Sequence, residues 1–236
     1  MLLYIIRHGD PDYSTDTLTP KGVLQAEAVA KRLQQAGINK IFSSPMGRAK
    51  QTAEPLCRLL NMEYAIEEWT HEIQDERLTT YPTGVPTSVN LVQNTHYFSD
   101  GSFDVPYSQA MSTPIIRNSH MDKACKYIWE NGVVFLQRLG YKAENNVYRI
   151  QRPNDDKVAL FCHAAFARAW IAMLLHIPLH VMCASTEYCH TGVTVLEFKN
   201  NPDGYTAPRC LCYSDMSHYY KEGLELRYNN DPELIL

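Results

Sequence analysis

A short apolar run followed at once by basic residues places the strongest limit on the fold. Residues 2–6, Leu-Leu-Tyr-Ile-Ile, are all strand formers, and apolar and polar residues do not alternate among them. A strand with this pattern is covered on both of its faces. The run therefore predicts a central strand in a sheet that lies between two layers.

The next segment carries the signals of a helix at both of its ends. Thr19 suits the N-cap position, Pro20 the first helical position, and Gly37 the position just past the end. The apolar residues between them recur at helical spacing: Val23, Ala26, Ala30 and Leu33. These signals predict a helix over residues 20–36.

Strands and helices then alternate along the chain. The pattern predicts strands at 40–43, 63–66, 158–162 and 192–198, an edge strand at 208–213, and helices at 48–60, 122–139 and 164–175. Such alternation is typical of a mostly parallel sheet whose right-handed crossovers place helices on both faces. The predicted fold class is α/β, a three-layer α/β/α domain with a mostly parallel central sheet.

The pattern changes character from about residue 74 to 118. Proline and glycine interrupt a polar and aromatic stretch that has no lasting periodicity. We interpret residues 1–236 as one domain with an inserted cap at about 74–118 that selects the substrate. Aromatic residues in the cap could stack on a substrate or pack the cap onto the sheet.

Composition excludes several classes of function. The formal net charge of -4 leaves no excess of Lys and Arg to coat nucleic acid or an anionic membrane. The first apolar run is too short for a signal peptide, and no apolar stretch approaches the length of a membrane span. The seven cysteines are odd in number and scattered, which is typical of reduced thiols, so a cytoplasmic location is expected.

Three predicted strands end in residues that bind anions. Arg7 and His8 follow the first strand, Arg48 follows the second within Ser-Ser-Pro-Met-Gly-Arg, and His163 follows the fourth. In an open parallel sheet these strand ends share one edge, where ligands bind. Two arginines, two imidazoles and a helix N-terminus at one edge suit a dianionic phosphoryl group.

These motifs resemble those of the histidine phosphatase superfamily, which includes cofactor-dependent phosphoglycerate mutases and fructose-2,6-bisphosphatases. The resemblance implies that His8 is the nucleophile and is transiently phosphorylated. It also implies that Arg7, Arg48 and His163 bind the phosphoryl group.

The resemblance further implies a general acid in the loop after the third strand. It assigns that role to Glu72 in Glu-Glu-Trp-Thr-His-Glu, with Glu68 as the alternative. A run this rich in Glu and Asp is otherwise typical of a solvated acidic face.

Four further residues are predicted to contact the substrate: Gly9, Asp10, Ala164 and His190. Asp10 is followed by Pro11, where many members of the superfamily carry Ser or Thr, so a hydroxyl contact is missing. Ala164 stands where the superfamily often has Gly; its backbone N–H is retained, with less room for close approach. His190 precedes a strand at the same sheet edge.

No metal site and no cofactor are expected. The spacings among Cys183, Cys189, His190, Cys210 and Cys212 do not fit common zinc sites, and we interpret these cysteines as structural thiols. The remaining histidines, among them His71 and His218, are interpreted as surface or packing residues.

We therefore expect a metal-independent phosphatase that hydrolyses a small-molecule phosphate monoester. Two arginines beside His8 disfavour its protonation, and a carbonyl could fix its tautomer. One alternative is mutase-type phosphoryl transfer. The resemblance to phosphoglycerate mutases is weaker here, because they have a longer stretch after Arg-His-Gly. In this chain only eight residues, Asp10 to Thr17, separate Gly9 from the helix entry at Leu18-Thr19. A second is a non-catalytic phosphate- or phosphopeptide-binding module. The sequence determines neither the leaving group nor the oligomeric state.

Overall fold

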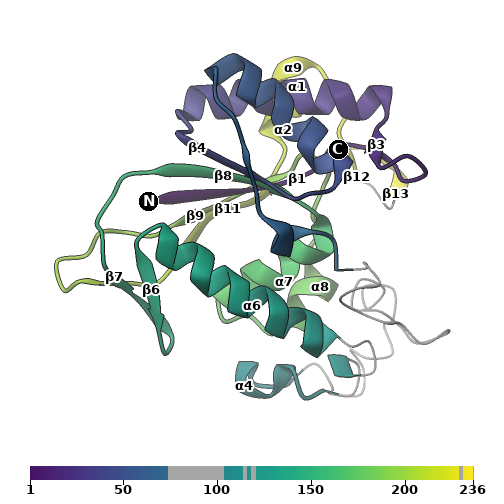
Figure 1. Ribbon diagram of the computed structural model, residues 1–236. Helices are drawn as coiled ribbons and strands as arrows, with labels where there is room; N and C mark the ends of the chain where they lie inside the picture. The colour runs from purple at the N-terminus through teal and green to yellow at the C-terminus, as the bar shows by residue number, and fades with distance from the viewer. Residues whose placement is uncertain (74–103, 114–115, 118–120, 229–230, 236) are drawn as a thin grey trace.

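A mixed six-stranded sheet runs through the middle of the computed structural model, which describes residues 1–73, 104–113, 116–117, 121–228 and 231–235. The strand order is β11-β9-β1-β8-β4-β5 (Figure 1). The strands are β1 (Leu2–Arg7), β4 (Lys40–Ser43), β5 (Ala65–Ile66), β8 (Lys157–Cys162), β9 (Val193–Glu197) and β11 (Arg209–Asp215). The apolar run at 2–6 therefore forms a central strand, as predicted.

Most of this sheet is parallel. Strand β1 pairs in parallel with β8, β8 with β4, and β4 with β5. Strand β9 runs antiparallel to β1, and β11 runs antiparallel to β9. Because β9 is reversed, its first residue, Val193, lies opposite Ile6 near the carboxyl end of β1. The loop before β9 thus reaches the same edge as the ends of β1, β4 and β8.

Helices cover both faces of the sheet (Figure 1). One face carries α1 (Pro20–Ala36), α2 (Gly47–Leu60) and α9 (Ser217–Glu222), and the other carries α6 (Met121–Arg138), α7 (Ala164–Leu174) and α8 (Leu179–Ser185). Ile6 faces the core under α1 and α2, whereas Leu3 and Ile5 face the core under α6 and α7. The predicted three-layer α/β/α class is confirmed.

Helix α1 begins and ends where its capping residues predict. The Thr19 hydroxyl accepts a hydrogen bond from the Gly22 N–H, and Pro20 opens the helix. Gly37 ends it in the left-handed conformation at φ 74°, which glycine adopts without a Cβ clash. Local chemistry alone is sufficient to define this element.

Several short elements were not predicted. A three-stranded sheet orders β10 (Tyr205–Thr206), β7 (Val147–Ile150) and β6 (Tyr141–Glu144), and two hairpins pair β2 (Pro11–Asp12) with β3 (Thr17–Leu18) and β12 (Arg227–Tyr228) with β13 (Asp231–Ile235). The two-residue strands β2, β3, β10 and β12 hold too little alternation to be recognised, whereas the longer β6, β7 and β13 were missed. The strand predicted at 63–66 is shorter in the structure and covers only β5.

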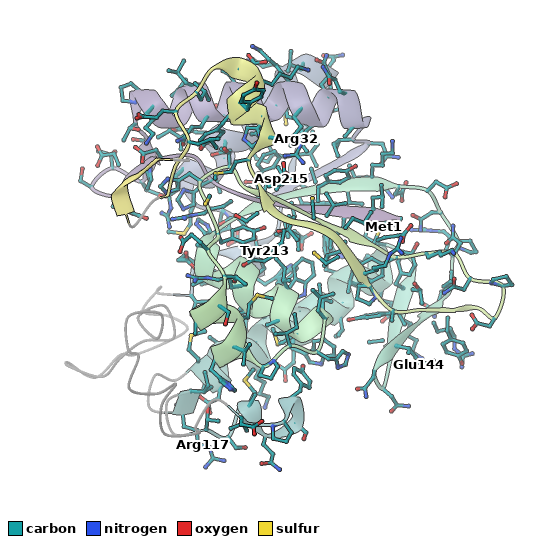
Figure 2. The ribbon with its side chains drawn as sticks, turned by 180° about the vertical axis from the view of Figure 1, so that it is seen from behind. Met1, Arg32, Arg117, Glu144, Tyr213 and Asp215 are labelled. Carbon is teal, nitrogen blue, oxygen red and sulfur yellow. The ribbon has the colours of Figure 1, made fainter. Side chains whose placement is uncertain are left out.

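An ion pair fixes the edge strand β11 to α1. Arg32 donates through Nη1 to the Asp215 carboxylate at 2.5 Å and to its carbonyl at 3.1 Å (Figure 2). Asp215 also accepts from the Ser217 N–H at 3.0 Å, at the start of α9. This arrangement holds α9 beside the loop that precedes β9.

Most of the cap predicted at 74–118 lies outside the described residues. Its described part includes a short helix, α4 (Tyr107–Ala110). The Tyr107 ring lies 5.1 Å from the His176 ring, centroid to centroid, so this cap aromatic packs against the segment after α7.

Two further expectations from the sequence concerned membrane spans and cysteines. No helix in the described part of the chain combines the length and apolarity needed to span a bilayer. All seven cysteines are free thiols.

Candidate active site

The four residues predicted to bind a phosphoryl group lie together at the carboxyl edge of the sheet. Arg7 and His8 stand at the end of β1, His163 follows β8, and Arg48 lies in the first turn of α2 after β4. The His8 and His163 rings are 5.1 Å apart, centroid to centroid. The charge of Arg48 acts on both imidazoles, so the cluster is contiguous.

The geometry around His8 leaves one ring nitrogen available for attack. Its Nδ1 lies 2.7 Å from the Gly9 carbonyl oxygen. A carbonyl only accepts hydrogen bonds, so Nδ1 carries the proton and Nε2 keeps its lone pair. Burial, then the charges of Arg7 and Arg48, hold the His8 pKa well below its ordinary 6.5. At neutral pH the imidazole is neutral, as a nucleophile must be.

Both arginines are buried and held in place. Arg7 donates through Nη1 to the Tyr188 carbonyl at 2.5 Å. Arg48 donates through Nη1 to the Asp16 carboxylate at 2.5 Å, and its guanidinium carbon lies 5.4 Å from the centre of the Tyr13 ring. Fixed guanidinium groups bind an anion without first losing rotamer freedom.

His163 is fully buried and contacts a serine. Its Nε2 lies 2.7 Å from the Ser44 hydroxyl, while its Nδ1 has no hydrogen-bond partner among the described residues. Burial, then the charges of His8, Arg48 and Arg7, hold the pKa of His163 well below 6.5. This imidazole is neutral at pH 7 and carries a single N–H.

The carboxylates after β5 have different surroundings. Oε1 of Glu72 accepts from the Ile73 N–H at 2.9 Å and from the Phe166 N–H at 3.1 Å, in the first turn of α7. Glu68 is exposed, and Glu67 is buried, bound to Arg138 and to the Trp69 indole. Of the two candidate acids, Glu72 is the one bonded to the helix that begins beside His163.

Two of the four predicted substrate contacts, Gly9 and Ala164, are defined by their backbone groups. The Gly9 carbonyl accepts from Nδ1 of His8, and the Gly9 N–H donates to the Thr52 hydroxyl at 3.0 Å. Ala164 is the first residue of α7, so its N–H lies at a helix N-terminus.

Asp10 and His190 lie close to each other. The Asp10 carboxylate accepts from the Thr19 hydroxyl at 2.6 Å, and its other oxygen lies 3.6 Å from Nδ1 of His190. The His190 ring is 5.7 Å from the His8 ring, centroid to centroid. Burial, then the charges of Arg7 and His8, lower the His190 pKa, so this ring is a neutral wall of the site.

Helix α9 supports the loop that carries His190. The Thr191 N–H donates to the His8 carbonyl at 3.2 Å, and Thr191 has a positive φ of 51°, which a β-branched residue seldom adopts. Its hydroxyl contacts Nε2 of His218 at 3.0 Å and the Tyr219 hydroxyl at 3.3 Å. Tyr219 in turn donates to the His190 carbonyl at 2.8 Å. His218 is a packing residue, as interpreted, but it packs behind the site.

Sequence reasoning missed several residues of the site. Ser44, Asp16 and Tyr13 contact His163 or Arg48, and His71 is buried rather than on the surface. Ser44 carried a usable signal, because it follows a strand at the same edge as His8. Among the described residues no group of three or more His, Cys, Asp or Glu side chains could hold a metal ion.

Sequence comparisons place the chain near one superfamily. Residues 3–82 match the family model of the histidine phosphatase superfamily, branch 1. The chain is 35% identical over 92 residues to a protein of Proteus mirabilis named "Probable phosphoglycerate mutase GpmB", covering 35% of this chain and 39% of that protein. A protein of the same name from Escherichia fergusonii is 30% identical over 80 residues. The chain thus spans well under half the length of these curated relatives.

Solved structures extend the likeness to most of the chain. The phosphoserine phosphatase of Entamoeba histolytica, in complex with 3-phosphoglyceric acid, has a TM-score of 0.60 at 21% identity over 92% of this chain and 98% of its own. The mycobacterial glucosyl-3-phosphoglycerate phosphatase has a TM-score of 0.58 at 19% identity over 90% of this chain and 98% of its own. The structural likeness concerns the fold. With the sequence match, it confirms the resemblance to the histidine phosphatase superfamily.

Proposed function

We propose that this chain, which carries the sequence signature of the histidine phosphatase superfamily over residues 3–82 and shares its fold, is a metal-independent phosphatase for small-molecule phosphate monoesters. One observation carries the proposal. His8 presents a neutral imidazole with Nδ1–H bound to the Gly9 carbonyl, inside a buried cluster that contains Arg7, Arg48 and His163. The cytoplasmic location predicted from the cysteines belongs to the same proposal.

The first step forms the phosphohistidine. Nε2 of His8 attacks phosphorus, a P–N bond forms, and the P–O bond to the leaving group breaks in line. Arg7, Arg48 and His163 stabilise the charge on the three equatorial oxygens. The leaving oxygen takes a proton from Glu72. Because Oε1 of Glu72 accepts two backbone N–H groups, we assign this proton to Oε2.

The second step returns the enzyme to its starting state. Water attacks the phosphorus of phosphohistidine while the Glu72 carboxylate takes a proton from that water. The P–N bond breaks, inorganic phosphate leaves, and Nε2 of His8 recovers its lone pair. Glu72 thereby regains the proton that it gave to the leaving group, and each step uses only the substrate, water and groups present at the site.

The test traps the intermediate. The purified chain is mixed with a ³²P-labelled phosphate monoester, denatured rapidly in alkali and then exposed to acid. We expect label on the wild-type chain that is stable in alkali and lost in acid, and none on His8→Asn. Both labelling and turnover should persist after dialysis against a chelator. Turnover by His8→Asn at the wild-type rate, or recovery only with a divalent ion, would refute the mechanism.

Mutase-type transfer is the second candidate, because the curated relatives of residues 3–82 are named phosphoglycerate mutases. Labelled phosphoenzyme is offered a phosphoglycerate in water. Phosphatase action predicts release of inorganic phosphate at a rate that is independent of the acceptor. Faster appearance of label in the acceptor would establish the mutase. A non-catalytic binding module predicts phosphate binding without any labelling of His8.

A further inference from the structure

Ser44 and His163 form a buried pair that links the ends of β4 and β8. Both residues are fully buried, and their hydroxyl and Nε2 are 2.7 Å apart although 119 positions separate them in sequence. Since His163 is a neutral imidazole, only one of its nitrogens carries hydrogen. Which nitrogen carries it depends on whether Ser44 donates or accepts.

The hydrogen bonds around Ser44 distinguish the two arrangements. Its oxygen already accepts from the Met46 N–H at 3.3 Å. If Ser44 donates to Nε2, its hydrogen and the Nε2 lone pair are both satisfied, and Nδ1–H of His163 is the one group left over. If Nε2–H donates instead, the Ser44 hydrogen has no acceptor among the described residues, and Nδ1 keeps a bare lone pair. A buried polar group without a partner costs about 1–3 kcal/mol.

Helix α7 does not use the His163 side chain. His163 is the N-cap residue of α7, where a lone pair on Nδ1 could accept from an N–H of the first turn, yet its side chain makes no capping hydrogen bond. The Phe166 N–H, a typical partner for such a cap, donates to Glu72 instead. Nδ1 therefore has no role in the helix, and an N–H there remains for a ligand.

We propose that Ser44 is a positioning residue that fixes His163 in the Nδ1–H tautomer, so that His163 donates to an equatorial oxygen of the phosphoryl group. This inference rests on the proposed function for its ligand. The opposite tautomer would turn a lone pair toward an anion and weaken binding in the transition state.

The first test is spectroscopic and needs no turnover. The ¹⁵N shifts of the His163 imidazole, assigned by comparison with His163→Gln, report which nitrogen carries hydrogen. In the wild-type chain near pH 7 we expect a pyrrole-type Nδ1 and a pyridine-type Nε2. Ser44→Ala should shift the signals toward the Nε2–H form. A wild-type spectrum with hydrogen on Nε2 would overturn the proposal, even with catalysis by His8 intact.

The second test separates positioning from folding. Ser44→Ala should lower kcat by about 10- to 100-fold, by analogy with the loss of a hydrogen-bonding partner that orients a histidine in metal sites, while Ser44→Thr, which keeps the hydroxyl, restores most of it. Ser43→Ala is the matched control, because Ser43 is equally buried but donates to the Ser44 carbonyl. If the Ser43 and Ser44 variants lose the same activity, the effect of Ser44 is structural and the positioning role is wrong.

Discussion

At the scale of single residues, the chemistry depends on where each hydrogen lies. Gly9 fixes the hydrogen of His8 on Nδ1 through a 2.7 Å contact. Glu72 is oriented by two backbone N–H donors on one of its oxygens. These local contacts orient the proposed nucleophile and the proposed acid before any substrate binds, which lowers the entropic cost of bringing them to the reacting centre.

The acid role predicts a dependence on the leaving group. Glu72→Gln should slow an alkyl phosphate by about 10² to 10⁴, the usual contribution of general acid catalysis, and slow a nitrophenyl phosphate far less. Aryl oxygens depart without a proton, whereas alkoxides do not. The measurement compares kcat for the two substrates. The exposed Glu68, as Glu68→Gln, is the control and should leave both rates near wild type; the reverse pattern would transfer the role to Glu68.

At the scale of elements, the hairpin of β2 and β3 closes one side of the site. Asp16, between the two strands, accepts from Nη1 of Arg48 and from the Gly47 N–H at 2.6 Å. A Cβ at Gly47 would lie 2.3 Å from the Asp16 carbonyl oxygen, so only glycine allows this approach. The hairpin thereby places a carboxylate against Arg48, which we propose binds the phosphoryl group, and against the start of α2.

This contact predicts a coupling between Asp16 and phosphate. Asp16→Ala leaves the buried Arg48 without its counterion and should lower the free energy of unfolding by roughly 1 kcal/mol. Inorganic phosphate should then stabilise the variant more than the wild type, because it supplies the missing negative charge. Thermal unfolding with and without phosphate measures this. Asp12→Ala is the control, because Asp12 lies in the same hairpin but accepts from Ser14 and not from Arg48; equal stabilisation of all three proteins would contradict the prediction.

Packing between α6 and α7 gives a second prediction for an element. A Cβ at Gly132 would lie 2.6 Å from Nε1 of the fully buried Trp170. Replacing glycine by alanine in a helix interior gains about 1 kcal/mol in propensity, but overpacking typically costs about 1–3 kcal/mol. We expect Gly132→Ala to be destabilised in urea unfolding, while Asn131→Ala, at a partly exposed position of α6, changes little. A stabilised Gly132→Ala would show that Trp170 can move.

At the scale of the whole molecule, buried neutral histidines connect the site to stability. Burial lowers the pKa of His218 from 6.5 to about 3, and His8, His163 and His190 also have lowered pKa values. Below pH 6.5 the unfolded chain binds protons that the folded chain does not. Their contribution to stability is therefore complete above pH 6.5 and is lost as the pH falls toward the folded-state values.

This linkage predicts that the free energy of unfolding falls steeply as the pH drops below 6.5. From pH 6.5 downward, each such histidine should cost about 1.4 kcal/mol per pH unit, and the term from His218 should extend to about pH 3. Urea unfolding between pH 8 and pH 3 measures the slope. His218→Asn should reduce this slope by the amount that corresponds to one fewer proton bound on unfolding. A slope that begins near pH 4, where carboxylates titrate, would show that the histidines do not control it.

The sequence by itself determined the main strands and helices and the sheet edge at which the candidate site lies. Capping residues defined α1, apolar runs defined β1 and β8, and the residues after those strands placed Arg7, His8 and His163 at one edge. These predictions succeeded because periodicity and capping are properties of neighbouring residues, and because parallel strands bring their carboxyl ends together.

Only the tertiary structure decided which groups complete the site. The reversed β9 brings Thr191 to His8, the hairpin brings Asp16 to Arg48, and sheet pairing brings Ser44 to His163 across 119 positions. A residue's local sequence does not determine such partners, because they depend on how remote elements pack. The tautomers and lowered pKa values arise at the same level, since burial and neighbouring charge exist only in the folded chain.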